Sequence, residues 1–419
     1  MNFKIKLIYK KFGILFLLFF MLFPFPIFAD DIDYQDTNQD SIETSITFEK
    51  NLSLNARSCI VLDRTSKQIL YGKNENNRVK MASTTKIMTA IVIIENYDLS
   101  QTIEVSKKAA GTGGSRLGLK TGDKITIRDL LYGLMLCSGN DAAVALAEST
   151  TGSIQNFSDL MNKKALDLGL INTHFESPHG LDSDEHYTTA YELAKLSDYA
   201  LNNKTFSQIV GTKNYTITIN GYPKNLSNTN ELLGNLNGVY GIKTGFTNGA
   251  NRCLVTACKR NNMDIITVVL GCDTKKFRTQ DSIKLIEYSF KNFEYINIQE
   301  LMNKEFEQWK TENINSIKVD KGLDPNIEIS IFPLETPIIP IKKEEVNNIN
   351  FSININPILF APLNKSDIIG TIAISTGTTT LLTANVIINE DIKKKNSINY
   401  FSDFIKNYSQ ILNSSIELD

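Results

Sequence analysis

The chain contains Met81-Ala82-Ser83-Thr84-Thr85-Lys86, a short polar stretch that opens the apolar run Ile87–Ile94. This run is apolar on nearly every face, which predicts a helix inside the protein. Ser83 and Lys86 are three residues apart, so a helix that begins here places the hydroxyl and the amine on one face, one turn apart. The stretch therefore predicts the buried helix around which the rest of the chain folds.

Ser83 and Lys86 form a candidate catalytic pair. A serine hydroxyl is a poor nucleophile until a neighbour removes its proton, and none of the three histidines lies near Ser83 in the sequence. An amine whose pKa is lowered by burial can take that role. The alternative is an ordinary capped helix, because serine is common at helix starts. The S-x-x-K pattern alone does not decide between the two.

Two further motifs favour the catalytic interpretation. Ser138-Gly139-Asn140 and Lys243-Thr244-Gly245 follow in that order. The trio S-x-x-K, S-D-N and K-T-G belongs to class A β-lactamases and penicillin-binding proteins. More narrowly, the chain resembles the D-alanyl-D-alanine carboxypeptidases among the low-molecular-mass penicillin-binding proteins. Gly139 departs from S-D-N, but S-G-N is usual for this carboxypeptidase group and argues against a class A β-lactamase.

The resemblance also runs through Asp141-Ala142-Ala143, Pro178–Asp182 with His186-Tyr187 behind it, and Asn228-Thr229-Asn230. It covers residues 50–295 strongly and the remainder loosely. It implies an α+β fold of the β-lactamase/DD-peptidase type, with an antiparallel five-stranded sheet flanked by helices and a helical subdomain. The site is expected between the two halves, and a small C-terminal all-β domain is expected beyond them.

The resemblance assigns three catalytic roles. Ser83 would attack a peptide carbonyl and become acylated, with Lys86 as the general base. Ser138 would relay a proton to the leaving amine. No metal and no organic cofactor is implied, because the histidines lack the partners of a metal site.

The remaining site residues bind the substrate or its developing charge. Asn140 would hydrogen-bond the substrate amide, and Lys243 and Thr244 would meet the substrate carboxylate. Gly245 leaves room for the substrate backbone beside the strand. By resemblance, the oxyanion hole consists of the backbone N–H groups of the acylated serine and of Phe246.

The predicted function is removal of the terminal D-alanine from peptidoglycan stem pentapeptides during cell wall maturation. β-Lactams such as penicillin would bind covalently as inhibitors. A β-lactamase is an alternative, but the chain between Ser149 and Ala190 offers only Glu176 and Glu185, without an E-x-x-L-N-like loop. The other alternative is a non-catalytic penicillin-binding or scaffold protein, against which the intact motifs argue.

Two features near the motifs have plain interpretations. Lys120-Thr121-Gly122 is a second K-T-G, but it stands in a polar turn before a helix rather than on a strand, so Lys120 is predicted to be a decoy. His179 lies in a sharp turn that is interpreted as structural rather than catalytic.

Cys137 directly precedes Ser138. Its side chain is either a reactive thiol at the site or a small apolar side chain, and the sequence leaves both interpretations open. The cysteine count of five is odd, so not all can pair within one chain.

The N-terminus predicts export. Four lysines precede a ten-residue apolar core and Ala29, which indicates a secretory signal peptide over residues 1–29. An uncleaved anchor is the alternative. The following residues 30–49 are predicted to be a disordered lead-in.

Loss of the four lysines would change the formal charge from −2 to −6, which does not favour nucleic acid as a partner. The protein is expected on the cell-wall face of the cytoplasmic membrane or secreted.

The sequence predicts the following elements for residues 50–295, the expected catalytic domain. A hairpin is expected first, then helices, then antiparallel strands and a closing helix. The hairpin comprises residues 58–62 and 68–71, and the helices comprise residues 128–136, 141–149 and 189–200. Thr189-Ala190-Tyr191-Glu192 is a capping box at the start of the last of these helices. Strand-like alternation begins over Tyr215–Ile219, the strands follow at residues 239–246, 253–258 and 264–271, and the closing helix comprises residues 281–293.

The C-terminal part has two expected segments. Residues 296–390 alternate between apolar and polar with interspersed prolines, which predicts a β-rich domain. Residues 391–419 predict an amphipathic helix with a basic lead, Lys393–Lys395, that lies in a membrane interface or packs on the β-rich domain. Its apolar face comprises Phe401, Phe404, Ile405, Tyr408, Ile411 and Leu412.

Overall fold

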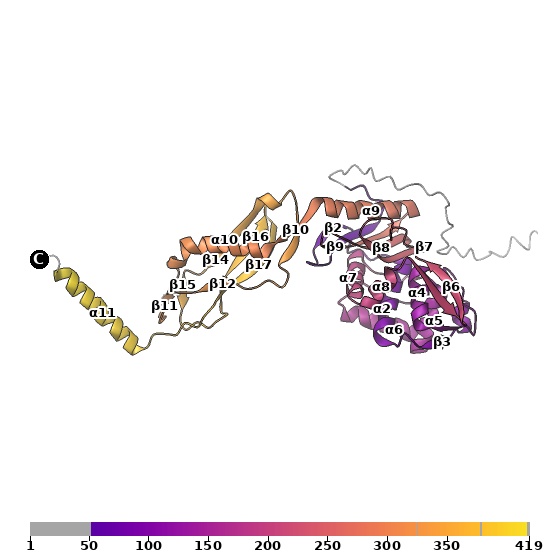
Figure 1. Cartoon of the computed structure of the whole chain (residues 1–419), viewed down its shortest axis with the longest axis horizontal. Coiled ribbons are helices and arrows are strands. Elements are labelled where there is room, and N and C mark those ends of the chain that lie inside the picture. The colour runs from indigo at the N-terminus through magenta and orange to yellow at the C-terminus, as the bar shows by residue number, and fades with distance from the viewer. Residues whose placement is uncertain (1–51, 325, 378, 417–419) are drawn as a thin grey trace, which may run out of the picture. The chain divides into compact units, whose positions relative to one another are not determined.

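The computed structural model describes residues 52–324, 326–377 and 379–416 (Figure 1). The predicted signal peptide and lead-in, residues 1–29 and 30–49, lie outside the described residues. The described chain forms two compact units, each with its own core. The first unit comprises residues 52–62 and 69–288, and the second comprises residues 63–68 and 289–416.

A five-stranded sheet organises the first unit, in the order β2-β1-β9-β8-β7. The β1/β2, β7/β8 and β8/β9 pairs are antiparallel. The three long strands are buried along most of their length, so both faces of the sheet must be covered. The strands are β1 (Ser58–Asp63), β2 (Ile69–Lys73), β7 (Val239–Thr247), β8 (Asn251–Arg260) and β9 (Met263–Cys272). The predicted antiparallel five-stranded sheet is confirmed.

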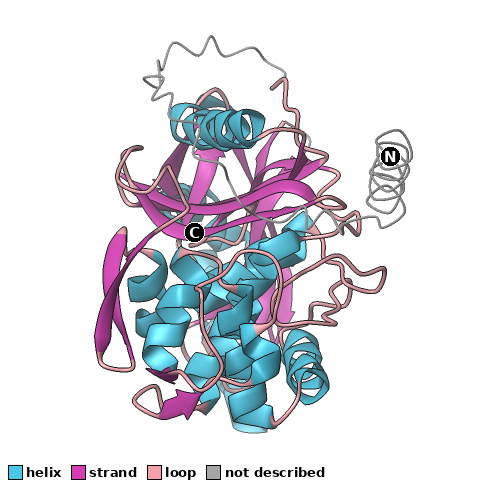
Figure 2. Cartoon of the chain, turned by 90° about the vertical axis from the view of Figure 1, so that its right-hand side faces the viewer, coloured by secondary structure: helices cyan, strands magenta, loops and turns pink. Residues whose placement is uncertain are grey.

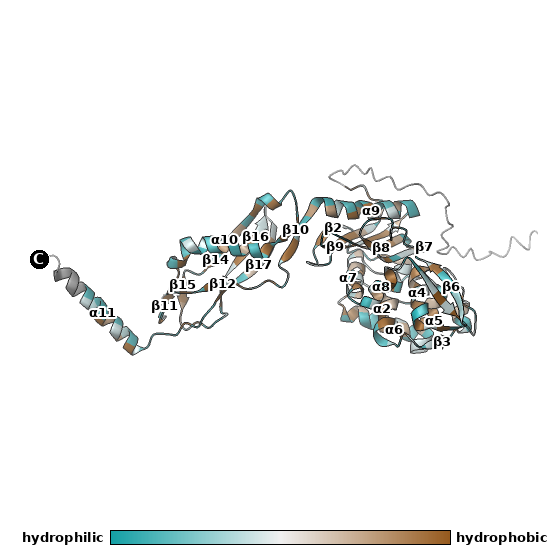
Figure 3. Ribbon diagram, viewed as in Figure 1, coloured by the Kyte–Doolittle hydropathy of each residue, from teal (hydrophilic) through white to brown (hydrophobic). Residues whose placement is uncertain are grey.

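Helices cover the sheet on both faces (Figures 1 and 2). Helix α9 (Lys275–Asn292) lies over one face, and a group of helices lies on the other. This group comprises α2 (Lys86–Asn96), α4 (Ile127–Leu136), α5 (Asn140–Thr151), α6 (Ile154–Asp167), α7 (Ala190–Leu201) and α8 (Lys204–Val210). Helix α2 is buried from Lys86 to Ile93, as its apolar run predicted. Figure 3 shows apolar residues recurring along α2 and the central strands.

Cap residues explain where the sequence prediction of helices was incomplete. The closing helix α9 begins at Lys275 and not at Asp281, because Thr274 Oγ1 accepts the Phe277 N–H at 3.1 Å. Helices α6 and α8 were not predicted, although Ser153 and Asn203 cap them in the same way. Each missed start is thus marked by a short polar residue.

The capping-box prediction at Thr189 is only half right. Thr189 Oγ1 accepts the Glu192 N–H at 3.0 Å, which makes Thr189 the N-cap of α7. The Glu192 carboxylate, however, accepts the Asn172 N–H at 2.9 Å and the Thr173 hydroxyl at 2.6 Å. Glu192 therefore fixes the loop before α7 to the start of the helix.

Short elements complete the first unit. Two small antiparallel strand pairs, β3/β4 and the hairpin β5/β6, flank the helices. Alternation from Tyr215 to Ile219 predicted the second of them. These elements are β3 (Thr102–Glu104), α3 (Lys107–Ala110), β4 (Lys124–Thr126), β5 (Asn214–Ile219) and β6 (Tyr222–Ser227).

The second unit contains a four-stranded sheet in the order β12-β17-β16-β14 and two two-stranded sheets, β10/β13 and β11/β15. A 16-residue helix, α10 (Ile298–Asn313), accompanies these sheets, so the segment predicted as β-rich also has a helix. Asn297 caps α10, which buries Ile298, Met302 and Phe306 in the unit's core. The strands are β10 (Phe293–Asn297), β11 (Lys318–Asp320), β12 (Ile329–Ile331), β13 (Ile338–Lys342), β14 (Ile349–Ile355), β15 (Ile358–Phe360), β16 (Ile368–Thr376) and β17 (Thr379–Ile388).

The chain continues into helix α11 (Ser397–Ile416). Its apolar side chains from Ile398 to Tyr408 are exposed, for example Ile398 at 77%, Phe401 at 67% and Phe404 at 63%. Lys395 Nζ forms an ion pair at 2.8 Å with Asp403 on this helix. Among the helices of the described residues, none combines the length and apolar character needed to cross a membrane. The side chains of Ile411 and Leu412 lie outside the description.

Candidate active site

The S-x-x-K stretch lies on a 3₁₀ turn that continues into α2. Residues Ala82–Thr85 form the turn η1, and Lys86 is the first residue of the α-helix. In a 3₁₀ turn, residues three apart stand directly above one another. Lys86 Nζ consequently lies 2.7 Å from Ser83 Oγ, and both side chains are buried. The sequence prediction that the two groups meet is borne out geometrically.

Lys86 also contacts two carbonyl oxygens. Its Nζ lies 2.7 Å from Asn140 Oδ1 and 2.8 Å from the backbone oxygen of His179. A carbonyl oxygen can only accept, so Lys86 must donate a hydrogen to each of them. The amine is therefore held at a fixed position beside the serine hydroxyl.

Ser138 lies on the connection between α4 and α5. Its φ is 61°, in the left-handed region that non-glycine residues seldom adopt. The side chain is 5% exposed, and its Oγ has no hydrogen-bond partner among the described residues. A buried hydroxyl without a partner is costly, and a bound molecule can supply the missing partner.

The neighbours of Ser138 hold a loop against it. The Asn140 N–H donates to Ser115 O at 2.7 Å, and Asn140 Nδ2 donates to Gly113 O at 2.9 Å. The buried carboxylate of Asp141 accepts the N–H groups of residues 117, 118 and 119 at 2.7 to 3.0 Å. The segment 113–119 thereby forms one wall of the site.

Strand β7 carries the K-T-G motif at the edge of the sheet. Lys243 is buried, and its Nζ donates to Thr244 O at 2.8 Å. The Thr244 and Thr229 hydroxyls lie 2.7 Å apart. A β-carbon on Gly245 would lie 3.1 Å from Ser83 N, so glycine permits the close approach of β7 to the turn η1.

The second K-T-G is elsewhere. Lys120 is exposed in a turn before β4, where its N–H donates to Asp123 Oδ2 at 2.7 Å. Lys243 lies on a strand that pairs with β8. The structure thus places only the later motif against the S-x-x-K turn.

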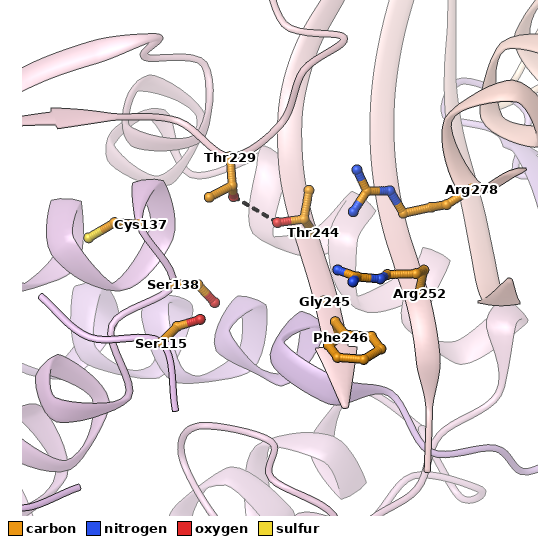
Figure 4. A pocket seen from close by; sticks show the side chains of 9 residues that line it. All are labelled: Ser115, Cys137, Ser138, Thr229, Thr244, Gly245, Phe246, Arg252 and Arg278. Carbon is orange, nitrogen blue, oxygen red and sulfur yellow. Dashed lines mark hydrogen bonds between the residues drawn. The ribbon is translucent and has the colours of Figure 1, made fainter. Parts of the chain in front are cut away.

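A pocket opens beside Ser138 and β7. Its lining includes two arginines that sequence reasoning missed, Arg252 from β8 and Arg278 from α9. Figure 4 shows both guanidinium groups near Thr244. The lining residues are Ser115, Cys137, Ser138, Thr229, Thr244, Gly245, Phe246, Arg252 and Arg278.

The two arginines are held by different contacts. The Arg252 guanidinium lies 3.8 Å from the ring centroid of Phe246, its register partner on β7. Arg278 is 1% exposed, its Nη2 lies 3.4 Å from Glu231 Oε1, and its Nε has no hydrogen-bond partner among the described residues. In the sequence, each of these arginines stands in a segment that is otherwise apolar or helical. This position was the signal by which sequence reasoning could have found them.

The Pro178–Asp182 loop closes the site from the helical side. His179 contributes its backbone oxygen to Lys86, whereas its ring Nδ1 accepts the Leu181 N–H at 3.2 Å. Burial, with nearby Lys86, lowers the pKa of His179 to about 3, so the ring is neutral. Asp182 accepts the Thr247 hydroxyl at 2.7 Å, which ties the loop to the end of β7.

Cys137 lines the pocket, but its sulfur is directed away from Ser138 (Figure 4). Its Sγ donates to Gly133 O at 3.1 Å. Burial raises the pKa of the Cys137 thiol to about 11. Because the thiolate is the nucleophile, these contacts favour the interpretation as a small apolar side chain. No group of three His, Cys, Asp or Glu residues suited to hold a metal occurs within the described part of the chain.

Both units match families of known proteins. Residues 45–274 match the D-alanyl-D-alanine carboxypeptidase family, and residues 310–394 match the C-terminal domain of penicillin-binding protein 5. The D-alanyl-D-alanine carboxypeptidase DacF of Bacillus subtilis is 34% identical over 369 residues, which are 86% of this chain and 91% of the relative.

Solved structures of related enzymes resemble this chain as well. The D-alanyl-D-alanine carboxypeptidase DacD of Francisella tularensis matches with a TM-score of 0.68 and 26% identity, covering 84% of this chain and 97% of that protein. The Streptomyces K15 DD-transpeptidase matches with a TM-score of 0.55 and 34% identity, covering 58% of this chain and 100% of that protein. The chain therefore belongs to the D-alanyl-D-alanine carboxypeptidase family.

Proposed function

We propose that the protein is a serine D-alanyl-D-alanine carboxypeptidase that removes the terminal D-alanine of peptidoglycan stem peptides through an acyl-enzyme on Ser83. The observation that carries this proposal is the 2.7 Å contact between the buried Ser83 Oγ and Lys86 Nζ. Family membership supports the substrate class, because the curated relatives bear this name.

Lys86 is the general base of the proposed acylation. A neutral amine has two N–H donors and one lone pair. Its donors fit Asn140 Oδ1 and His179 O, which leaves the lone pair for the Ser83 hydroxyl hydrogen. Transfer of that proton to Lys86 accompanies attack of Ser83 Oγ on the peptide carbonyl carbon.

The backbone N–H groups of Ser83 and Phe246 are proposed as the oxyanion hole. The turn η1 and strand β7 approach one another at Gly245, which brings the two donors to one side of the site. Donors fixed before the reaction stabilise the developing charge without reorganisation. Asn140 Nδ2 carries a second hydrogen besides the one given to Gly113 O, and this hydrogen is available to the substrate amide.

Ser138 is proposed to pass the proton from Lys86 to the leaving amine. Its buried hydroxyl has no hydrogen-bond partner among the described residues, and it lines the pocket in which the leaving D-alanine would lie. Lys243, on strand β7, is proposed to add positive charge near Ser138. Breakage of the peptide bond then yields free D-alanine and the Ser83 ester.

The terminal carboxylate of the substrate is proposed to bind between Thr244, Arg252 and Arg278. Arginine matches the planar, bidentate geometry of a carboxylate. Two guanidinium groups and the two paired threonine hydroxyls give the pocket positive charge and hydrogen-bond donors (Figure 4). This pocket explains a requirement for a free C-terminus, which defines a carboxypeptidase.

A β-lactamase remains the closest alternative. Rapid hydrolysis of a penicilloyl ester needs a positioned carboxylate, and the glutamates between Ser149 and Ala190 are Glu176 and Glu185. Both are exposed, and the Glu176 carboxylate accepts a hydrogen bond from Ser183. With a peptide substrate, the released D-alanine leaves the pocket and admits water, whereas the opened lactam keeps its amine tethered. A long-lived penicilloyl-enzyme is therefore proposed.

The outer segments are proposed to export and locate the enzyme. Residues 1–29 are proposed as a signal peptide that directs the chain to the cell-wall side of the membrane. The catalytic domain is proposed to span residues 50–295, with residues 296–390 as a spacer. Residues 391–419 are proposed to lie in the membrane interface, supported by the exposed apolar side chains of Phe401, Phe404, Ile405 and Tyr408 and by Lys393–Lys395.

The test compares two activities of one preparation. The mature chain, residues 30–419, should release D-alanine from a peptide ending in D-Ala-D-Ala and should retain a fluorescent penicillin for long periods. Ser83→Ala should lose both activities while its circular dichroism spectrum stays unchanged. Fast penicillin turnover without D-alanine release would identify a β-lactamase instead, and absence of both activities in the wild type would indicate a scaffold protein.

A further inference from the structure

The residue before the nucleophile has an unusual backbone conformation. Ala82 has a φ of 49°, in the left-handed region, and it begins the turn η1. A β-carbon makes this region unfavourable, so surrounding contacts must hold the backbone there. Because Ser83 follows directly, this conformation fixes the direction of the Ser83 N–H and of its side chain.

A chain of hydrogen bonds leads from Ala82 to a buried histidine. Thr85 Oγ1 donates to Ala82 O at 2.8 Å. His186 Nε2 lies 2.7 Å from the same Thr85 Oγ1, and the Glu176 N–H donates to His186 Nδ1 at 3.0 Å. The Thr85 hydroxyl has one hydrogen, which Ala82 O receives, so His186 Nε2 must donate. Nδ1 must accept, which selects one neutral tautomer.

The imidazole is held firmly in this arrangement. His186 is 2% exposed, and its ring lies edge-on to Phe175 with centroids 5.8 Å apart. Burial lowers the pKa of His186 to about 4, which agrees with the neutral tautomer that both hydrogen bonds require. The two ring nitrogens bond to the Thr85 hydroxyl and the Glu176 N–H, so the hydrogen-bonded path from His186 to the nucleophile runs through Thr85.

Gly180, in the Pro178–Asp182 loop, packs against Ala82. A β-carbon on Gly180 would overlap Ala82 O and crowd Thr85 Oγ1. The loop backbone is therefore packed directly against the turn, and the histidine bond is the polar part of one continuous support.

We propose that His186 is a positioning residue for acylation: by donating to Thr85 Oγ1, it orients the Thr85–Ala82 hydrogen bond and holds the backbone of Ala82 and Ser83 in the reactive geometry. This inference rests on the proposed acylation of Ser83. It adds a role for a histidine that lies outside the S-x-x-K, S-G-N and K-T-G motifs and far from Ser83 in the sequence.

Three substitutions separate this role from a general structural one. His186→Gln places an amide N–H near the position of Nε2 and keeps the donor to Thr85. His186→Asn reaches only the position of Nδ1, so it keeps a partner for the Glu176 N–H and loses the Thr85 bond. Thr85→Val removes the hydroxyl and retains the branched shape.

The kinetic pattern tests the proposal. Because misplacement of reacting groups by about 1 Å costs up to about 100-fold in rate, we expect His186→Asn and Thr85→Val each to lower kcat and the penicillin acylation rate about 10- to 100-fold. KM for the peptide should change by less than about threefold, because the arginine pocket is intact. His186→Gln should stay within about fivefold of the wild type. The Thr85→Val/His186→Asn double variant should be no slower than the slower single variant.

The outcomes also separate this proposal from the proposed function. A wild-type protein that is not acylated would refute the proposed function itself. An active wild type with equal rates for His186→Gln and His186→Asn would overturn the positioning role, as would multiplied losses in the double variant. Thermal unfolding of all variants shows whether a loss of rate reflects unfolded protein.

Discussion

A β-carbon on Gly245 would lie 3.1 Å from the backbone nitrogen of Ser83. The same atom would lie 3.2 Å from Thr84 N and 3.2 Å from the β-carbon of Ala82. Strand β7 and the turn η1 thus approach with no side chain between them. The two proposed oxyanion donors, on Ser83 and Phe246, depend on this approach.

We predict that Gly245→Ala slows acylation by about 10- to 100-fold, because the added methyl displaces the turn from the strand. The loss should appear in the rate of labelling by fluorescent penicillin. Gly152→Ala is the matched control. Gly152 has a φ of 80° and open space around it, so that variant should lose about 1 kcal/mol of stability and keep its acylation rate. Equal rates for both variants would contradict the role of the close approach.

The two K-T-G copies provide a second contrast. Lys243→Ala should reduce D-alanine release by at least about 100-fold, because a buried cation is removed from the site. Lys120→Ala should change it by less than about tenfold, a barrier difference below about 1.4 kcal/mol, because Lys120 is exposed in a remote turn. Steady-state release of D-alanine measures both. A reversed order would contradict the assignment of the catalytic copy.

The arginine pocket predicts a dependence on the substrate's C-terminus. Arg278→Gln and Arg252→Gln should each lower kcat/KM at least about tenfold for a peptide with a free carboxylate, since a charge-assisted hydrogen bond contributes about 1.5–3 kcal/mol. For the same peptide with a C-terminal amide, the wild type should already be slow and the variants should lose little more. Similar losses on both peptides would show that the arginines act only on the fold.

Two histidines with lowered pKa values predict that stability falls with acid. Burial lowers the pKa of His179 to about 3 and of His186 to about 4, against an ordinary value of 6.5. Below pH 6.5 the unfolded chain binds protons that the folded chain does not. Their contribution is therefore complete above pH 6.5 and is lost as pH falls toward 4, with a slope of about 1.4 kcal/mol per pH unit for each histidine.

His186→Gln measures this contribution. We expect the free energy of unfolding of the wild type to fall more steeply than that of His186→Gln between pH 6.5 and about 5. Urea unfolding at several pH values gives both slopes. Parallel slopes would mean that His186 is also protonated in the folded protein.

Helix α11 predicts binding to a lipid surface. Phe401→Ser/Phe404→Ser should weaken sedimentation with anionic phospholipid vesicles by at least about tenfold, because each buried phenylalanine contributes about 1.5–3 kcal/mol. Asn407→Ser/Gln410→Ser, on the opposite face, is the control and should bind like the wild type. D-alanine release in solution should be unaffected. Equal vesicle binding by all three proteins would remove the interfacial role of this face.

Several parts of the fold followed from local sequence. The apolar run after Lys86 predicted a buried helix because no polar face was available to meet water. Alternation from residue 215 predicted the β5 strand. The starts of α6, α8 and α9 were missed, although Ser153, Asn203 and Thr274 mark them, because a cap is a single residue and competes with many similar ones in loops.

The sequence by itself determined the pair Ser83 and Lys86, because a spacing of three residues brings two side chains together in any helical turn. It also distinguished Lys243 from Lys120, since one lies in a strand pattern and the other in a turn. Only the tertiary structure decided that Arg252 and Arg278 share a pocket with Thr244, and that His186 reaches the turn before the nucleophile. Contacts between distant segments depend on how the sheet and helices pack, and no local periodicity encodes that packing.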